Sequence, residues 1–156
     1  MIEARLRPLE ATDLPALRAL HDASFAGLAR AYDARVAAAH AALVAEPGYA
    51  EDVLRSDVWV AEREGRLLGS AGWLAQDGAA RIRKVFIHPD AARQGLATRL
   101  VRAAEARSGA TRFVLRAYLD AVPLYRRLSY VEDRPGAMEL PGGVSMPVLF
   151  MRKGLA

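Results

Sequence analysis

The sequence predicts one α/β domain (α+β) in which helices cover a mixed β-sheet. Its 156 residues are enough for one ordinary domain with a substantial core. Alternating and helically spaced apolar segments follow one another in the order β-α-α-β-β-β-α-β-α-β-β. No repeat, low-complexity segment or Pro/Gly/Ser-rich linker divides the chain. We therefore expect residues 1–156 to form a single domain.

The N-terminal third predicts a strand and two helices. Apolar and charged residues alternate over 2–7, as in a half-buried strand, and no apolar signal segment begins the chain. Asp13 is expected to N-cap a helix whose leucines share one face. A second, alanine-rich helix is predicted over 33–44, stopping before the Glu-Pro-Gly at 46–48.

The middle of the chain predicts a hairpin and a further strand. Residues 58–61 and 67–74 are the two arms, joined by a turn at Glu64-Gly65. After a second turn at 76–78, another strand is expected over 80–87.

The remaining segments alternate between helices and strands. An amphipathic helix is predicted from Leu96 to near Gly109, followed by a strand at 113–115. A short helix is expected to start at Asp120, which we interpret as its N-cap.

The C-terminal stretch begins at Tyr130-Val131. It is predicted to contain a Pro/Gly-rich loop over 135–143 and a last strand around 148–151. The predicted sheet is completed by this last strand.

The positive charge of the chain makes an anionic ligand plausible. The formal net charge is +4, and nearly all of the 22 basic residues are arginine. They are spread along the chain without a dense run or aromatic interleaving, so we do not expect a nucleic-acid partner. A small polyphosphate ligand fits the charge equally well.

Composition excludes several classes of chemistry. The chain has no cysteine, which rules out disulfides, thiolate catalysis and thiol-ligated zinc. Its three histidines are scattered without metal-ligand spacing, and we expect no metal. No stretch approaches the roughly 20 apolar residues of a membrane helix, so no membrane partner is expected. A reducing cytoplasm suits such a chain, and the sequence leaves a homodimer open.

The most informative segment runs from Val85 to Thr98: a buried strand, a Pro-stiffened turn and a small-residue entry into a helix. Helix N-termini present unpaired N–H groups that hold anions. Gly95 and Ala97 would let a phosphate approach the backbone, and Arg93 adds charge. Taken alone, an ordinary strand-loop-helix connection explains this segment as well.

This run resembles the acetyl-CoA motif of the GNAT superfamily, [Gln/Arg]-x-x-Gly-x-[Gly/Ala], except that Ala92 stands at the opening position. The resemblance implies a mostly antiparallel, twisted sheet and an acetyl-CoA cosubstrate. It implies that the pyrophosphate is cradled by Arg93, Gln94, Gly95, Leu96, Ala97 and Thr98. It also implies that Val85, Phe86 and Ile87 pair their backbone with the pantetheine arm.

A second match covers residues 116–130 and resembles the C-terminal signature of the same superfamily. Asp120 replaces the usual Asn, and Ser129 the usual Gly. The resemblance implies that Tyr125 protonates the leaving thiolate, because a phenol with a pKa near 10 stays protonated at neutral pH. The alternative is that Tyr125 is a packing aromatic beside Leu124 and Leu128.

The resemblance implies direct transfer of an acetyl group to an amine of a small molecule, or of a peptide or protein N-terminus. A backbone amide of the coenzyme strand would polarise the thioester carbonyl. The base is left open: Glu62, His88 and Asp120 are candidates, and each also has an ordinary structural explanation.

Acceptor choice is expected to belong to the segments 25–32 and 134–146, with Phe25, Tyr32 and Met138 as candidate lining residues. Arg83 and Lys84 are expected near the acceptor, which would favour an acceptor that also carries a carboxylate or phosphate. Two other functions remain as alternatives: a non-catalytic acyl-CoA sensor on the same fold and, more remotely, a basic nucleic-acid-binding domain.

Overall fold

The protein is built on one seven-stranded sheet, seen in a computed structural model that describes residues 3–27 and 31–154. The strand order is β1-β2-β3-β4-β5-β7-β6, and neighbours are antiparallel except for β4 and β5. This confirms the predicted mixed, mostly antiparallel sheet flanked by helices. The strands are β1 (Arg5–Pro8), β2 (Asp57–Arg63), β3 (Arg66–Gln76), β4 (Ala79–Ile87), β5 (Arg112–Tyr118), β6 (Val131–Leu140) and β7 (Val144–Gly154).

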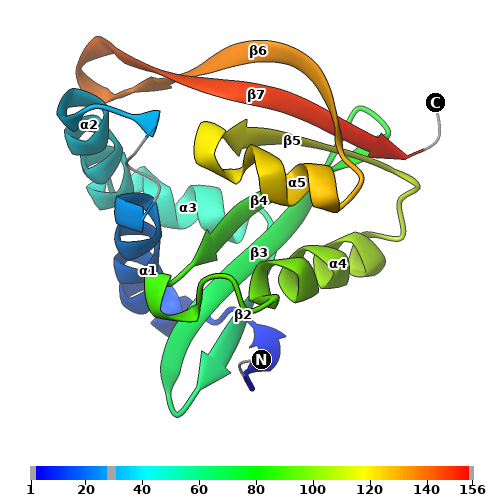
Figure 1. Cartoon of the computed structure of the whole chain (residues 1–156). Coiled ribbons are helices and arrows are strands. Elements are labelled where there is room, and N and C mark those ends of the chain that lie inside the picture. Colours follow the sequence, from blue (N-terminus) through cyan, green and yellow to red (C-terminus); the bar gives the residue numbers. More distant parts are fainter. Residues whose placement is uncertain (1–2, 28–30, 155–156) are drawn as a thin grey trace.

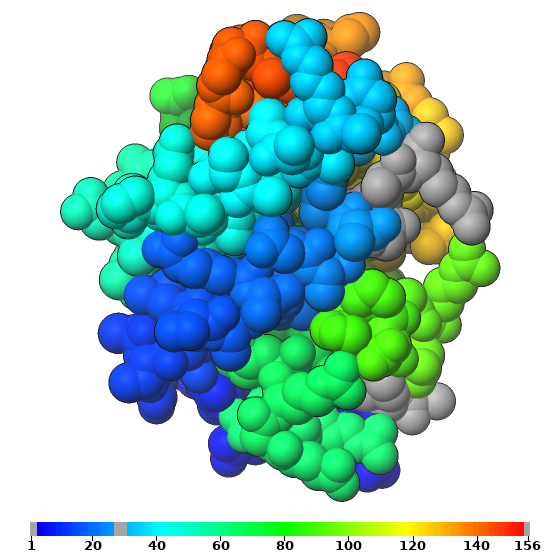
Figure 2. Space-filling model, turned by 90° about the vertical axis from the view of Figure 1, so that its left-hand side faces the viewer, coloured from blue at the N-terminus to red at the C-terminus, as the bar shows by residue number. Residues whose placement is uncertain are grey.

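Helices cover both faces of the sheet (Figure 1). They are α1 (Leu14–Gly27), α2 (Ala34–Ala45), α3 (Gly48–Leu54), α4 (Leu96–Ser108) and α5 (Val122–Arg127). The first three lie next to one another across one side of the molecule (Figure 2). No helix in the described ranges is long and apolar enough to cross a membrane.

Helix α4 follows directly from its sequence. Buried side chains recur at the spacing of one helical face, at Leu96, Leu100, Val101 and Ala104. Glycines cap both ends with positive φ, +79° at Gly95 and +65° at Gly109. The apolar face packs on the sheet with Ile82 of β4 and Phe113 of β5, among others. The opposite face of the sheet packs on α1, α2 and α3.

The two parallel strands separate soon after they meet. Only two residue pairs join β4 to β5, Ala80 with Phe113 and Arg81 with Val114. Beyond Arg81 the described residues of β4 have a strand partner on the β3 side alone. Figure 1 shows that β4 and β5 diverge. The edge of β4 that faces β5 is therefore open over several residues.

A β-bulge marks the open part of β4. Ser70 of β3 is paired with Phe86 and Gly72 with Arg83, so Lys84 and Val85 together oppose a single residue. Lys84 has φ +58°, unusual for a residue with a side chain. The Ser70 hydroxyl donates a hydrogen bond of 2.7 Å to the Lys84 carbonyl and so stabilises this conformation.

Two elements differ from the sequence prediction. The chain does not stay irregular after α2, because α3 begins at Gly48, with Pro47 as its N-cap. Proline suits a helix start, where its missing N–H removes no hydrogen bond. The predicted loop over 135–143 is largely strand β6. Pro135 is tolerated because β6 is an edge strand, and Gly136 leaves room for the Phe150 ring.

The two predicted helix caps also differ. Asp13 ends a short 3₁₀ turn, where its carboxylate accepts the Glu10 N–H at 2.8 Å and two hydrogen bonds from Arg7. Asp120 does not cap α5; it accepts the Ala31 N–H at 3.1 Å. By contrast, Asp33 caps α2 as its N-cap. The first strand begins at Arg5, and residue 2 lies outside the described residues.

Candidate active site

A cavity of about 290 Å³ lies where β4 and β5 diverge. Its walls come from α1, the C-terminal end of α2, α3, β4, β5, α5 and β6. Segments distant in sequence thus share one small chamber. Its charged lining residues are Glu46, Asp52, Arg81, Arg83, Lys84 and Arg116, and its tyrosines are Tyr49, Tyr118 and Tyr125.

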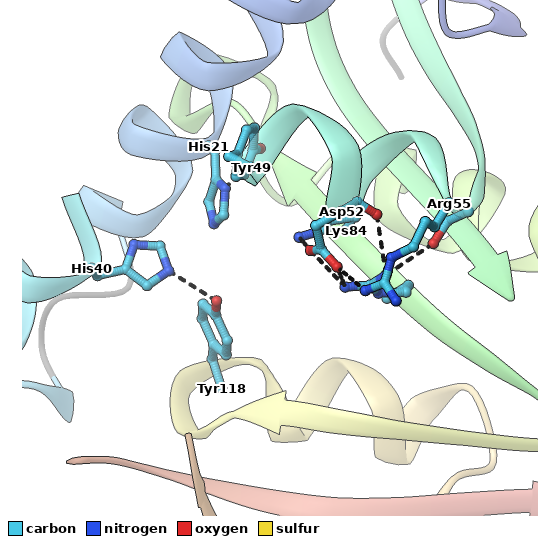
Figure 3. Close-up of polar contacts among 9 residues, drawn as sticks. His21, His40, Tyr49, Asp52, Arg55, Lys84 and Tyr118 are labelled. Atoms are coloured by element: carbon cyan, nitrogen blue, oxygen red, sulfur yellow. Dashed lines mark hydrogen bonds and ion pairs between the residues drawn. The ribbon is translucent and has the colours of Figure 1, made fainter. Parts of the chain in front are cut away.

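Asp52 of α3 is the centre of a charge cluster in this cavity (Figure 3). Both of its oxygens accept hydrogen bonds from the Arg83 guanidinium, at 2.9 and 2.8 Å. Lys84 Nζ lies 2.6 Å from Asp52 Oδ2, and Arg55 donates to Oδ1 at 2.6 Å. The bulge allows two consecutive residues of β4 to reach the same carboxylate.

The ionisation of this cluster follows from its surroundings. Burial alone would raise the pKa of Asp52, but hydrogen bonds from Lys84, Arg55 and Arg83 hold it well below its usual range. Burial lowers the pKa of Lys84, an effect that Asp52 partly offsets. Asp52 is therefore a carboxylate at all working pH values and a poor proton acceptor.

Two buried histidines form a polar cluster beside the cavity (Figure 3). His21 Nδ1 lies 3.0 Å from the Tyr49 hydroxyl, and His40 Nε2 lies 2.9 Å from the Tyr118 hydroxyl. The two imidazole rings meet edge to face at 4.7 Å, and His21 stacks on Phe86 at 3.6 Å.

Both imidazoles are held neutral. Burial, then His40 and Lys84, lowers the pKa of His21 to about 2. Burial, then Lys84, lowers the pKa of His40 to about 4. The other ring nitrogens, His21 Nε2 and His40 Nδ1, are buried without a hydrogen-bond partner among the described residues.

Tyr125, the predicted acid, lies on α5 and lines the cavity with Val85 and Phe86 of β4. It is only 6% exposed. Its ring also packs in the core, edge to face with Tyr130 at 5.8 Å. Burial raises the pKa of its phenol, which keeps the hydroxyl protonated. The position is compatible with both interpretations of Tyr125, as proton donor and as packing residue.

The three predicted strand residues do not behave alike. Val85 and Phe86 line the cavity, whereas Ile87 does not. The Ile87 N–H donates a hydrogen bond of 3.2 Å to the Ser24 hydroxyl of α1. A pantetheine arm would therefore have to replace Ser24 as the partner of that N–H.

The six predicted phosphate-binding residues surround the start of α4, beyond the C-terminal end of β4. Arg93, with φ +61°, and Gly95 both adopt the left-handed conformation. Among the described residues, no turn or loop hydrogen bond is donated by the backbone N–H groups of residues 93–98, as expected for a helix start. A Cβ at Gly95 would meet no atom within 4 Å, so the space above it is open. The segment has the form of an anion-binding turn.

The alternative bases lie elsewhere. Glu62 pairs with Arg7 at the β1–β2 edge, and His88 accepts the Asp90 N–H in the turn after β4. Neither they nor Asp120 lines the cavity. Ser129 has φ +74°, so it retains the left-handed backbone that the usual glycine of the motif would adopt.

The predicted acceptor residues are only partly brought together. Met138, Arg83 and Lys84 line the cavity, as expected. Phe25 and Tyr32 are core residues: Phe25 stacks on His40 at 3.9 Å, and the Tyr32 hydroxyl donates to the Pro147 carbonyl at 2.7 Å. Residues 28–30 of the predicted acceptor segment lie outside the described residues.

Sequence reasoning missed several lining residues: His21, Tyr49, Asp52, Arg81 and Arg116. The alternation of β4 could have placed Arg81 and Arg83 on one face. Nothing local indicated Asp52, because its helix was not predicted. No group of His, Cys, Asp or Glu in the described part of the chain could hold a metal ion.

Comparison with known proteins identifies the family. The family model described as "Acetyltransferase (GNAT) domain" matches residues 55–132, which is half of the chain. The protein therefore belongs to the GNAT acetyltransferase family. A comparison with curated protein sequences gives no significant match.

Solved structures agree on the fold. A GCN5-related N-acetyltransferase from Rhodopseudomonas palustris is 23% identical with a TM-score of 0.88, covering 99% of this chain and 98% of that one. The PaiA N-acetyltransferase from Thermoplasma acidophilum, in complex with coenzyme A, is 13% identical with a TM-score of 0.75, covering 99% and 100%. A phosphinothricin acetyltransferase from Sinorhizobium meliloti, in complex with AcCoA, is 19% identical with a TM-score of 0.68, covering 99% and 90%.

The first prediction concerns the Asp52 cluster. Asp52→Asn should lower the free energy of unfolding by on the order of 2 kcal/mol, because Arg83 and the buried Lys84 lose their shared counterion. Urea unfolding at neutral pH measures this. The control is Asp133→Asn, which removes an exposed carboxylate from Arg134 and should change stability little. Equal small effects in both variants would contradict a structural role for the cluster.

The second prediction is a stability change with pH. His21 and His40 are neutral in the folded protein, whereas in the unfolded chain they take up protons below a pKa near 6.5. Acidification therefore favours unfolding, and each histidine should remove about 1 kcal/mol of stability between pH 6.5 and 5.5. The loss continues to about pH 4 for His40 and about pH 2 for His21.

Urea titrations at the two pH values test this in the wild type and in His40→Gln. The variant cannot titrate at position 40, so the change between the two pH values should shrink by about 1 kcal/mol. An unchanged pH dependence in His40→Gln would show that His40 is not held neutral.

Proposed function

We propose that the protein is an N-acetyltransferase that moves an acetyl group directly from acetyl-CoA to an amine of a small molecule, or of a peptide or protein N-terminus. The observation that carries this proposal is the open edge of β4 after Arg81, which borders the cavity lined by Tyr125. A cytoplasmic location remains part of the proposal.

The coenzyme would follow the chain from β4 to α4. Its pantetheine arm would pair with the backbone of Val85, Phe86 and Ile87, as an added strand does. Its pyrophosphate would bind the N–H groups of residues 93–98, where the helix dipole favours negative charge. The Thermoplasma and Sinorhizobium structures are complexes with coenzyme A and AcCoA, respectively, and this supports acetyl-CoA as the cosubstrate here.

The reaction would take place inside the cavity. The amine nitrogen attacks the thioester carbonyl carbon, and a backbone N–H of the bulged strand stabilises the oxyanion. As the C–S bond breaks, the Tyr125 hydroxyl donates its proton to the leaving thiolate. The amine proton goes to a base or to water. Asp52 is paired with arginine and lysine side chains and is a poor base. Glu46 is the other carboxylate of the cavity lining and therefore the candidate base.

The third prediction tests the phosphate site. Gly95→Glu should weaken acetyl-CoA binding by on the order of a hundredfold or more, because a carboxylate would stand where the pyrophosphate binds. Calorimetric titration with acetyl-CoA measures the affinity.

A matched control separates charge at the site from backbone strain. Gly109→Glu places the same side chain at the other end of α4, at a glycine with similar positive φ and with equally open space. It should bind acetyl-CoA like the wild type. Equal affinity in folded Gly95→Glu and in the control would remove the site from residues 93–98.

The fourth prediction concerns Tyr125→Phe, which removes one hydroxyl and keeps the ring. Loss of a general acid should reduce turnover on the order of a hundredfold, while acetyl-CoA affinity stays near wild type. Release of free thiol from acetyl-CoA with a panel of amines measures turnover.

Tyr130→Phe is the control. Tyr130 packs against Tyr125, but its hydroxyl donates to Glu105 and does not line the cavity. It should keep its turnover. Unchanged rates in both variants would leave Tyr125 a packing residue, and acetyl-CoA binding without thiol release for any amine would favour the sensor alternative.

A further inference from the structure

The cavity carries more positive charge than its carboxylates compensate. Four cationic side chains line it, Arg81, Arg83, Lys84 and Arg116, against two carboxylates, Asp52 and Glu46. Asp52 pairs with Arg83 and Lys84 together. Among the described residues, neither the Arg81 nor the Arg116 side chain forms an ion pair or a hydrogen bond.

These two arginines point from neighbouring strands to the same side of the sheet. Arg81 is opposite Val114 in the parallel β4–β5 ladder, so their side chains share a face. Because alternate residues of a strand share a face, Arg116 lies on it as well. The opposite face carries Ile82 and Leu115, which are buried in the core with α4.

Arg81 is partly buried and Arg116 is exposed, so the repulsion between the two like charges falls mainly on Arg81. Burial, followed by the charges of Arg116 and Arg83, lowers the pKa of Arg81 to about 10. A cleft lined by charges of one sign attracts a ligand of the opposite sign, which would supply the missing negative charge. Guanidinium groups suit carboxylates in particular, because their planar N–H donors match the two oxygens.

We propose that Arg81 and Arg116 bind a carboxylate of the acceptor, so that the acceptor is a small amino acid or a similar amine that also carries a carboxylate. The inference rests on the proposed acetyl transfer at this cavity. A volume of about 290 Å³ is at the small end for a ligand site, and the thioester must share it. The acceptor is therefore of amino-acid size rather than a long peptide.

Acceptor binding provides the fifth prediction. Calorimetric titration of the protein saturated with coenzyme A compares the common amino acids, their amides and O-phosphoethanolamine. At least one amino acid should bind tenfold or more tightly than its amide. Arg81→Gln and Arg116→Gln should each reduce this preference at least tenfold and leave the affinity for coenzyme A unchanged. Arg112→Gln, on β5 but outside the cavity, should bind like the wild type.

Each contrary outcome has its own meaning. Equal binding of acids and amides, no binding of any amino acid, or stronger binding of O-phosphoethanolamine would overturn the carboxylate assignment. Weaker binding of coenzyme A in Arg81→Gln would assign the arginines to the coenzyme phosphates and also overturn it. Failure of the wild type to bind coenzyme A would instead refute the proposed function.

Discussion

The early end of the β4–β5 ladder is the constraint on which the site depends. After Arg81 the two parallel strands no longer share hydrogen bonds, and a sheet that stayed closed would leave no space there. The gap persists because each strand is held from its other side, β4 by β3 and β5 by β7. Helices α4 and α5 pack on one face of the separating strands, and α3 with the ends of α1 and α2 closes the other.

The gap between β4 and β5 brings several cationic side chains together, and α3 supplies a carboxylate that compensates part of their charge. The wall of β4 presents Arg81, Arg83 and Lys84 to a partly buried space, where charge is costly without a partner. The bulge at Lys84 turns two of these cations onto Asp52. The neighbouring histidines stay neutral mainly because they are buried, and the charge of Lys84 lowers the pKa of both His21 and His40 further. Charge that α3 leaves uncompensated remains on Arg81 and Arg116.

Sequence reasoning predicted the succession of strands along the chain and α4 well, because spacing and glycine caps are local signals. It also placed Arg83, Lys84 and Met138 correctly beside the cavity. The prediction failed for features that depend on contacts between segments distant in the sequence. A bulge depends on the partner strand. Asp52 and Lys84 are 32 positions apart in the sequence. The helix that carries Asp52 begins with a Pro-Gly pair, which is more typical of a loop. The edge position of β6 made Pro135 acceptable in a strand, and only the fold reveals an edge.

The two sides of the gap are specified by different kinds of chemistry. On the proposed coenzyme side, the binding groups are backbone N–H groups at the start of α4 and along β4, so the sequence has only to supply small residues such as Gly95 and a correct backbone. On the proposed acceptor side, the groups are side chains from at least five elements, including His21, Asp52 and Arg116. A fold shared at a TM-score of 0.88 with 23% identity fits this division, because backbone geometry survives extensive side-chain change. Differences in acceptor among proteins of this fold should therefore arise on the α1–α3 face, where no short motif marks them.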